Sequence, residues 1–176
     1  MTLPRDLRPE LLRFADQYIR MARPGFRRWA KSAVESDEVR NEVRPAGFLS
    51  NTVIEQFLDD DSRPTPASAP VTVSDRVLRH LVRPQKAAVR GRAIPEQVLL
   101  DLPGHLRRPR AVLWDKQHQN LVYVWEIPGE SRYAVLPVNI NHTEAGQLTQ
   151  SIKSGGLVSQ ATLSDSIRYG EMEGSL

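Results

Sequence analysis

Three runs of β-branched and aromatic residues, joined by short turn-forming segments, constrain the fold of this chain more than any other feature. The runs cover residues 111–114, 120–127 and 132–140. The segments between them, 115–119 and 128–131, are too short for a helix and have the length of hairpin connections. We therefore expect an antiparallel meander, to which residues 147–153 are expected to add a fourth strand.

Helical periodicity precedes these strands. One helix is expected after Ser74, a good N-cap residue, and a second after Pro95, which suits a first helical turn. Each helix places its apolar residues on one face. The apolar faces of the helices and of the sheet are buried only if they pack against each other. The predicted fold class is α+β, with an N-terminal helical arm followed by two helices packed on a four-stranded, mainly antiparallel sheet.

The stretch from 59 to 70 divides the chain. Its sequence, Asp-Asp-Asp-Ser-Arg-Pro-Thr-Pro-Ala-Ser-Ala-Pro, suits neither a helix nor a strand ladder. We therefore expect a helical arm over residues 1–58, a Pro-rich linker over 59–70 and a compact α+β domain over 71–176.

The arm needs a partner surface. It has amphipathic helical segments over about 9–36 and after Ser50, but too few large apolar residues for a core of its own. Its aromatic side chains would then stay exposed unless another protein covered them. We expect the arm to dock on such a protein, with Trp29 and Phe57 as anchors.

Basic residues are concentrated in the middle of the chain. Residues 63–116 carry 11 Lys or Arg and 4 Asp or Glu, against 10 and 11 in residues 1–62 and 3 and 6 in residues 117–176. A segment of net charge +7 between two acidic segments attracts anions, and nucleic acid is the partner most often bound by such a face. Ordinary solvated helix faces explain the same arginines equally well.

Several classes of protein and site are excluded or not expected. The chain has no cysteine, which rules out disulfides, thiolate metal sites and cysteine nucleophiles. No apolar run reaches the ~18 residues of a membrane-spanning helix, so no membrane partner is expected. The start, Met-Thr-Leu-Pro-Arg-Asp, is unlike a signal peptide, so we expect the protein to stay inside a cell. Without a Walker motif, a paired-glycine phosphate loop or clustered His, Asp and Glu, no cofactor or metal is expected.

Four segments of the C-terminal part resemble a known family. They are Val-Ser-Asp-Arg-Val-Leu-Arg-His at 73–80, Ile-Pro-Glu-Gln-Val-Leu-Leu-Asp-Leu-Pro at 94–103, Arg-Pro-Arg-Ala-Val-Leu-Trp-Asp at 108–115 and Asn-Leu-Val-Tyr-Val at 120–124. The chain resembles phage-encoded nucleases of the barnase/EndoU/colicin E5-D/RelE-like group, which are found at the C-termini of MuF-like minor head proteins of tailed phages. The resemblance implies an RNase-like α+β domain in 71–176, metal-independent RNA cleavage, and residence in the virion or in the host cytoplasm during assembly or after delivery. The arm is too short for a complete head-morphogenesis domain.

Metal-independent RNA cleavage requires a base, an acid and cations that stabilise the phosphorane. His80 is the leading candidate among the four histidines, because only His80 combines the basic segment with an expected helix. Lys153 and Ser151, at the end of the fourth strand, are its expected catalytic partners. The residues expected to bind phosphate or RNA are Arg76, Arg83, Lys86, Arg90 and Arg92. Each of these residues is also compatible with an ordinary polar surface.

Two functions from different classes follow. The first is a phage virion-associated protein with a C-terminal metal-independent endoribonuclease domain, for which RNA is a partner. The second is a non-catalytic structural virion protein that docks on a phage capsid or portal protein through its helical arm. The basic segment and His80 favour the first, and the aromatic residues of the arm favour the second. A helix-turn-helix regulator is disfavoured, because Pro84 falls badly for its turn.

Overall fold

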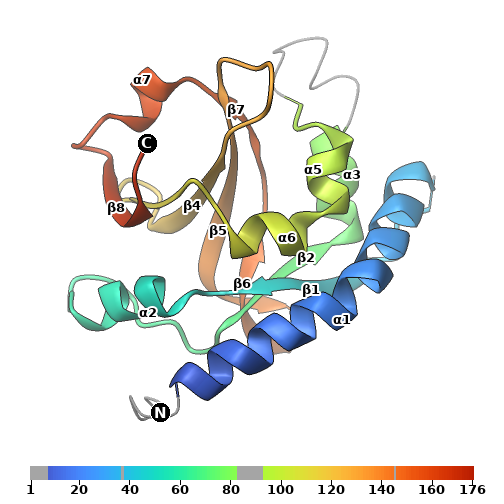
Figure 1. Ribbon diagram of the computed structural model, residues 1–176, viewed down its shortest axis with the longest axis horizontal. Helices are drawn as coiled ribbons and strands as arrows, with labels where there is room; N and C mark the ends of the chain where they lie inside the picture. Colours follow the sequence, from blue (N-terminus) through green and yellow to red (C-terminus); the bar gives the residue numbers. More distant parts are fainter. Residues whose placement is uncertain (1–7, 37, 83–92, 145) are drawn as a thin grey trace.

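One sheet with helices packed on it makes up the described part of the chain (Figure 1). The computed structural model describes residues 8–36, 38–82, 93–144 and 146–176. The helices are α1 (Arg8–Glu35), α2 (Asn51–Leu58), α3 (Asp75–Val82), α5 (Glu96–Leu100), α6 (Leu102–Arg107) and α7 (Gln160–Leu163). The strands are β1 (Val43–Phe48), β2 (Pro70–Ser74), β3 (Ala111–Asp115), β4 (Asn120–Trp125), β5 (Tyr133–Glu144), β6 (Gln147–Ile152), β7 (Gly156–Val158) and β8 (Tyr169–Gly174).

The sheet is mixed. Its strands follow the order β1-β2-β6-β5-β4-β3-β8, and β7 pairs with the first residues of β5. β2 and β6 run parallel, whereas the other neighbouring strands are antiparallel. The α+β class was predicted correctly. The predicted two helices on a four-stranded sheet were wrong, because the described residues form six helices and eight strands.

The four predicted strands lie in the middle of this sheet as β3, β4, β5 and β6. The strands that the sequence did not reveal lack a long alternation of branched residues. β1 contains Pro45 and Gly47, with a register shift between them, and β7 is only three residues long. β8, with the sequence Tyr-Gly-Glu-Met-Glu-Gly, contains two glycines and two glutamates. Such segments become strands because a neighbouring strand offers hydrogen bonds, which no local pattern reports.

The N-terminal part does not form the helical arm of the predicted fold class. β1 pairs with β2, and α1 contacts α3, α5, α6 and β1. The two expected docking anchors are buried. Trp29 is 8% exposed and donates from Nε1 to Glu42 Oε2 over 2.9 Å, and Phe57 is 1% exposed and meets the ring of Trp114 edge-on at 5.4 Å. In this fold, neither ring is available to a partner.

Side-chain hydrogen bonds attach residues 65–68, inside the expected linker, to β5 and β6. Asn141 donates from Nδ2 to the carbonyl of Thr65 over 2.9 Å and accepts from the backbone N–H of Ala67 over 2.6 Å. Ser68 donates to the carbonyl of Leu148 over 2.7 Å, and Gln150 donates to the carbonyl of Ser68 over 2.8 Å. These four bonds hold the segment along the β5–β6 hairpin.

Two apolar clusters lie on opposite faces of the sheet. The larger cluster joins residues of α1, α2, α3, α5 and α6 to one face, and the smaller cluster lies around Leu163 of α7 on the other. Residues along β2 alternate between these faces: Val71 and Val73 belong to the larger cluster, so Thr72 points to the opposite side. Figure 1 shows α7 and β8 at the end of the molecule away from α3. Of the helices described, none is both long and apolar enough to cross a membrane.

Candidate functional site

A cleft of about 520 Å³ opens between α1 and α6. Its lining residues are mostly charged, with four arginines, two aspartates and one histidine. They are Asp16, Ile19, Arg20, Arg23, Asp101, Gly104, His105, Arg107 and Arg108. With the histidine neutral, this lining carries a net charge of +2, in a space large enough for a small organic ligand.

The helix periodicity of α1 provides one wall of the cleft. Asp16, Arg20 and Arg23 follow one another at spacings of four and three residues, so they share a face of the helix. The other wall is the short helix α6, where Gly104 faces the cleft. A Cβ at Gly104 would lie 2.9 Å from Asp101 Oδ2 and 3.1 Å from Arg23 Nη2. Glycine at this position therefore allows the carboxylate and the guanidinium to lie against the backbone of α6.

Two ion pairs connect the walls of the cleft. Arg23 of α1 pairs with Asp101, which precedes α6, and Asp16 of α1 pairs with Arg107 of α6. Arg107 holds Asp16 with two nitrogens, and its Nη2 lies 3.0 Å from Asp16 Oδ2. The hydrogen bond from Arg107 lowers the pKa of Asp16 below its usual value, and the same bond raises the pKa of Arg107. Both groups are therefore charged at neutral pH.

His105 is the titratable group of the cleft whose charge changes most readily near neutral pH. Its ring meets the ring of Trp125 edge-on at 5.9 Å, and its backbone carbonyl accepts a hydrogen bond from Trp125 Nε1 over 2.6 Å. Burial lowers the pKa of His105 below its usual value, and the charge of Arg23 adds to this effect, whereas Asp101 opposes it. The imidazole is therefore neutral at pH 7 and free to accept a proton.

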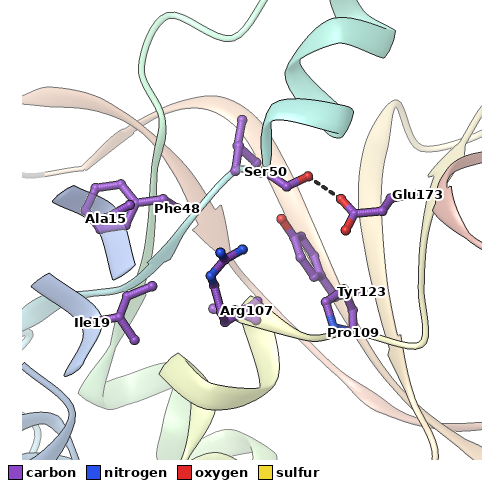
Figure 2. Close-up of a pocket in the computed structure, with 10 residues that line it drawn as sticks. Ala15, Ile19, Phe48, Ser50, Arg107, Pro109, Tyr123 and Glu173 are labelled. Atoms are coloured by element: carbon purple, nitrogen blue, oxygen red, sulfur yellow. Dashed lines mark hydrogen bonds between the residues drawn. The ribbon is translucent and has the colours of Figure 1, made fainter. Parts of the chain in front are cut away.

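A small pocket extends from the cleft toward the sheet, and Figure 2 shows its lining. It shares Ile19 and Arg107 with the cleft and has room for about one water molecule, with a volume of about 20 Å³. The hydroxyl of Ser50 donates to the carboxylate of Glu173, and the Tyr123 hydroxyl points into the same space (Figure 2). Burial and the charge of Glu173 raise the pKa of Tyr123, so the phenol stays protonated.

The structure brings Ser151 and Lys153 together, with a glutamate that the sequence did not single out. Glu144 accepts from Ser151 Oγ over 2.7 Å, from Lys153 Nζ over 3.2 Å and from Thr72 Oγ1 over 3.1 Å. Burial acts to raise the pKa of Glu144, but the hydrogen bonds from Ser151 and Lys153 outweigh it and lower the pKa. The cluster is internally hydrogen-bonded and Ser151 is fully buried, which is typical of a structural polar network.

His80 does not join this cluster. His80 and Arg76 are exposed on α3, whose Leu78 and Leu81 pack into the larger apolar cluster. Thr72 and its register partner Ser151 point to the other side of the sheet. The sheet therefore separates His80 from Lys153, and the expected cleft between them is not formed. The other expected phosphate ligands, Arg83, Lys86, Arg90 and Arg92, lie outside the described residues.

A third polar cluster closes the turn between β3 and β4. Asp115 accepts from His118 Nδ1 over 2.9 Å and from Arg168 Nη2 over 2.8 Å, as well as from the backbone N–H groups of Gln117 and His118. Burial acts to raise the pKa of Asp115, but the hydrogen bonds from Arg168 and His118 outweigh it and lower the pKa. This cluster fixes the hairpin turn to the start of β8.

The cleft is the site that sequence patterns did not reveal. Its two walls come from segments more than 75 residues apart, as the Arg23–Asp101 pair shows. Within the described ranges, no group of three or more His, Asp or Glu side chains converges as a metal site requires. Comparison with protein-family models, with curated proteins and with solved structures gives no match.

Proposed function

We propose that this chain is a phage virion-associated protein that binds RNA in the cleft between α1 and α6 and cleaves it without a metal ion. The observation that carries the proposal is an imidazole, His105, that lines a cleft together with four arginines. Burial lowers the pKa of His105, which is in keeping with the role of a base. The resemblance of residues 71–170 to phage-encoded RNase-like domains is in agreement with it. The proposal moves the expected base from His80 on α3 to His105 on α6.

The chemistry follows from the groups in the cleft. His105 takes the proton of a ribose 2′-OH, and the 2′-oxygen attacks the adjacent phosphorus. Arg20 and Arg108, which line the cleft, stabilise the charge that develops on the phosphate oxygens. The bond from phosphorus to the 5′-oxygen breaks, and water in the open cleft protonates the departing oxygen. The products are a 2′,3′-cyclic phosphate and a 5′-hydroxyl.

Little supports the alternative of a structural protein that docks through its helical arm. That function needs Trp29 and Phe57 on the surface, and both are buried against the rest of the fold. The proposed partner is therefore RNA, and contact with capsid or portal proteins has no surface assigned to it.

Replacing Arg20 and Arg108 together with alanine is expected to weaken RNA binding by about tenfold or more, because each arginine supplies a charge-assisted contact to phosphate. The measurement is fluorescence anisotropy with a 2′-O-methyl oligoribonucleotide, which lacks the attacking hydroxyl. For single strands, the slope of log affinity against log salt should fall by about 1.4 when two phosphate contacts are lost.

The matched control replaces Arg28 and Arg76, two exposed arginines that do not line the cleft. It removes the same charge from the protein and should leave both affinity and salt slope close to those of the unaltered chain. Equal losses in the two double variants would mean that RNA is bound by net charge alone, and the cleft would lose its assignment.

A further inference from the structure

We propose that Asp16 occupies the phosphate subsite of this cleft, so that a phosphate group of RNA binds among Arg20, Arg107 and Arg108 by displacing the Asp16 carboxylate. The inference rests on the proposed function, because it assigns the subsite within the same cleft. It makes Asp16 an internal competitor of the substrate.

Arg107 grips Asp16 in the way in which it would grip a phosphate. Its Nε and Nη2 reach the two carboxylate oxygens of Asp16, which is a bidentate arrangement. The planar guanidinium fork matches two oxygens of a carboxylate and two oxygens of a phosphate with the same geometry. An entering phosphodiester would therefore find its preferred partner already holding an anion.

Two further arginines surround the same carboxylate. Arg20 lies one helical turn after Asp16 on α1, Arg108 directly follows Arg107, and all four residues line the cleft. The charges of Arg20 and Arg108 add to the hydrogen bond from Arg107 in lowering the pKa of Asp16. Within the described residues, neither Arg20 nor Arg108 makes a direct ion pair. One carboxylate therefore stands among three guanidinium groups, two of which have capacity for further oxygens.

The pair at the other end of the cleft differs in this respect. Asp101 pairs with Arg23 close to the backbone at Gly104, where even a methyl group would collide with its carboxylate. Asp16 is the more open carboxylate, with 38% of its side chain exposed against 25% for Asp101. Arg23 holds Asp101 with the same fork, but Arg20 and Arg108 lower the pKa of Asp16 by their charge. A change of the Asp16 side-chain rotamer would release Arg107 to a ligand without moving either helix.

The test replaces Asp16 by asparagine in the full chain, which removes the charge and keeps the size. The Kd for the 2′-O-methyl oligoribonucleotide is expected to fall by about tenfold, and inorganic phosphate should bind more tightly as well. Asp16→Glu keeps an anion at the site and should bind as weakly as the unaltered protein. Asp101→Asn removes the same charge from the other pair and is expected to change the Kd by less than Asp16→Asn.

Unchanged or weaker binding of inorganic phosphate by Asp16→Asn would overturn the inference, because it would mean that Asp16 only positions Arg107. Thermal melting of each variant shows whether the fold is retained. If Asp16→Asn does not fold, tight binding by Asp16→Glu would overturn the inference equally. Failure of the proposed function gives a different set of results. RNA would neither bind in the cleft nor be cut, whereas Asp16→Asn would still bind inorganic phosphate more tightly than the unaltered protein.

Discussion

Alanine in place of His105 is expected to lower the rate of RNA cleavage by roughly 10²–10⁴-fold, the usual contribution of a general base. Burial against Trp125 and the positive charge of Arg23 keep the imidazole neutral, so it is ready to accept the 2′-OH proton. The assay is cleavage of single-stranded RNA in excess chelator, with the variant checked for folding. Because the pKa of His105 is lowered, cleavage by the unaltered protein should fall with decreasing pH only at values below about 6.5.

The chain contains its own controls for this experiment. His80→Ala removes the base expected from the sequence, on α3, and His118→Ala removes a histidine in the β3–β4 turn that bonds Asp115. Both variants should cleave at the unaltered rate. Loss of cleavage in His80→Ala with full activity in His105→Ala would restore the assignment made from the sequence and remove His105.

Alanine in place of Phe57 is expected to reduce the free energy of unfolding by about 3–5 kcal/mol, the usual cost of removing a buried phenyl ring. The ring is 1% exposed and packs edge-on against Trp114 of β3, so its loss leaves a cavity between α2 and the sheet. Denaturation in urea, followed by tryptophan fluorescence, gives the difference in unfolding free energy directly.

Phe14→Ala is the matched control, because Phe14 lies on α1 with 63% of the residue exposed. Its unfolding free energy should change by no more than about 0.5 kcal/mol. If Phe57→Ala proved equally mild, residues 51–58 would not be part of the packed core. Residues 51–58 would then be free to leave the sheet, as the linker prediction requires for the part of the chain before residue 59.

The central strands of the sheet could be predicted from the sequence because their residues show a local pattern of alternating branched and aromatic side chains. The alternating runs became β3 to β6, and Ser50 caps α2 by accepting from the N–H of Val53 over 3.1 Å. Pro137 has no N–H to donate, which suits an edge or a bulge of a sheet. It lies in β5 between Val135, the last residue paired with β7, and Val138, the first paired with β6. On this side, β5 changes its neighbour from β7 to β6 at Pro137, so neither strand needs an N–H from the proline.

The rest of the fold depends on contacts that no local pattern reports. β1 and β8 are strands because β2 and β3 lie beside them, not because their residues favour extended backbone. Pro103-Gly104 resembles a helix stop in sequence, yet both residues lie inside α6, where the proline takes an early position that needs no N–H. The same proline would be unfavourable in the interior of α5 and is favourable in the first turn of α6.

The residues of the cleft were not predicted as a site, for the same reason. Ser151 of β6 and Lys153, which follows β6, both bond Glu144, because alternate residues of an extended segment share a face. The opposite placement of His80 depends on which face α3 covers, and that is decided by packing. The arginines of α1 were hidden in a segment whose net charge is −1, since a charge sum does not distinguish the two sides of a helix. Arg20 and Arg23 become a feature only when α6 lies against them.

The most direct measurement of the central claim uses the four histidines of the chain, 80, 105, 118 and 142, as reporters. They lie in different places: on α3, in the cleft, in the β3–β4 turn and on β5. Titration with the 2′-O-methyl oligoribonucleotide, followed by the imidazole proton resonances, therefore shows where RNA binds. The account predicts that the His105 resonances shift with saturating dependence on RNA while the other three stay in place. Movement of His80 or His118 with His105 unchanged would contradict it.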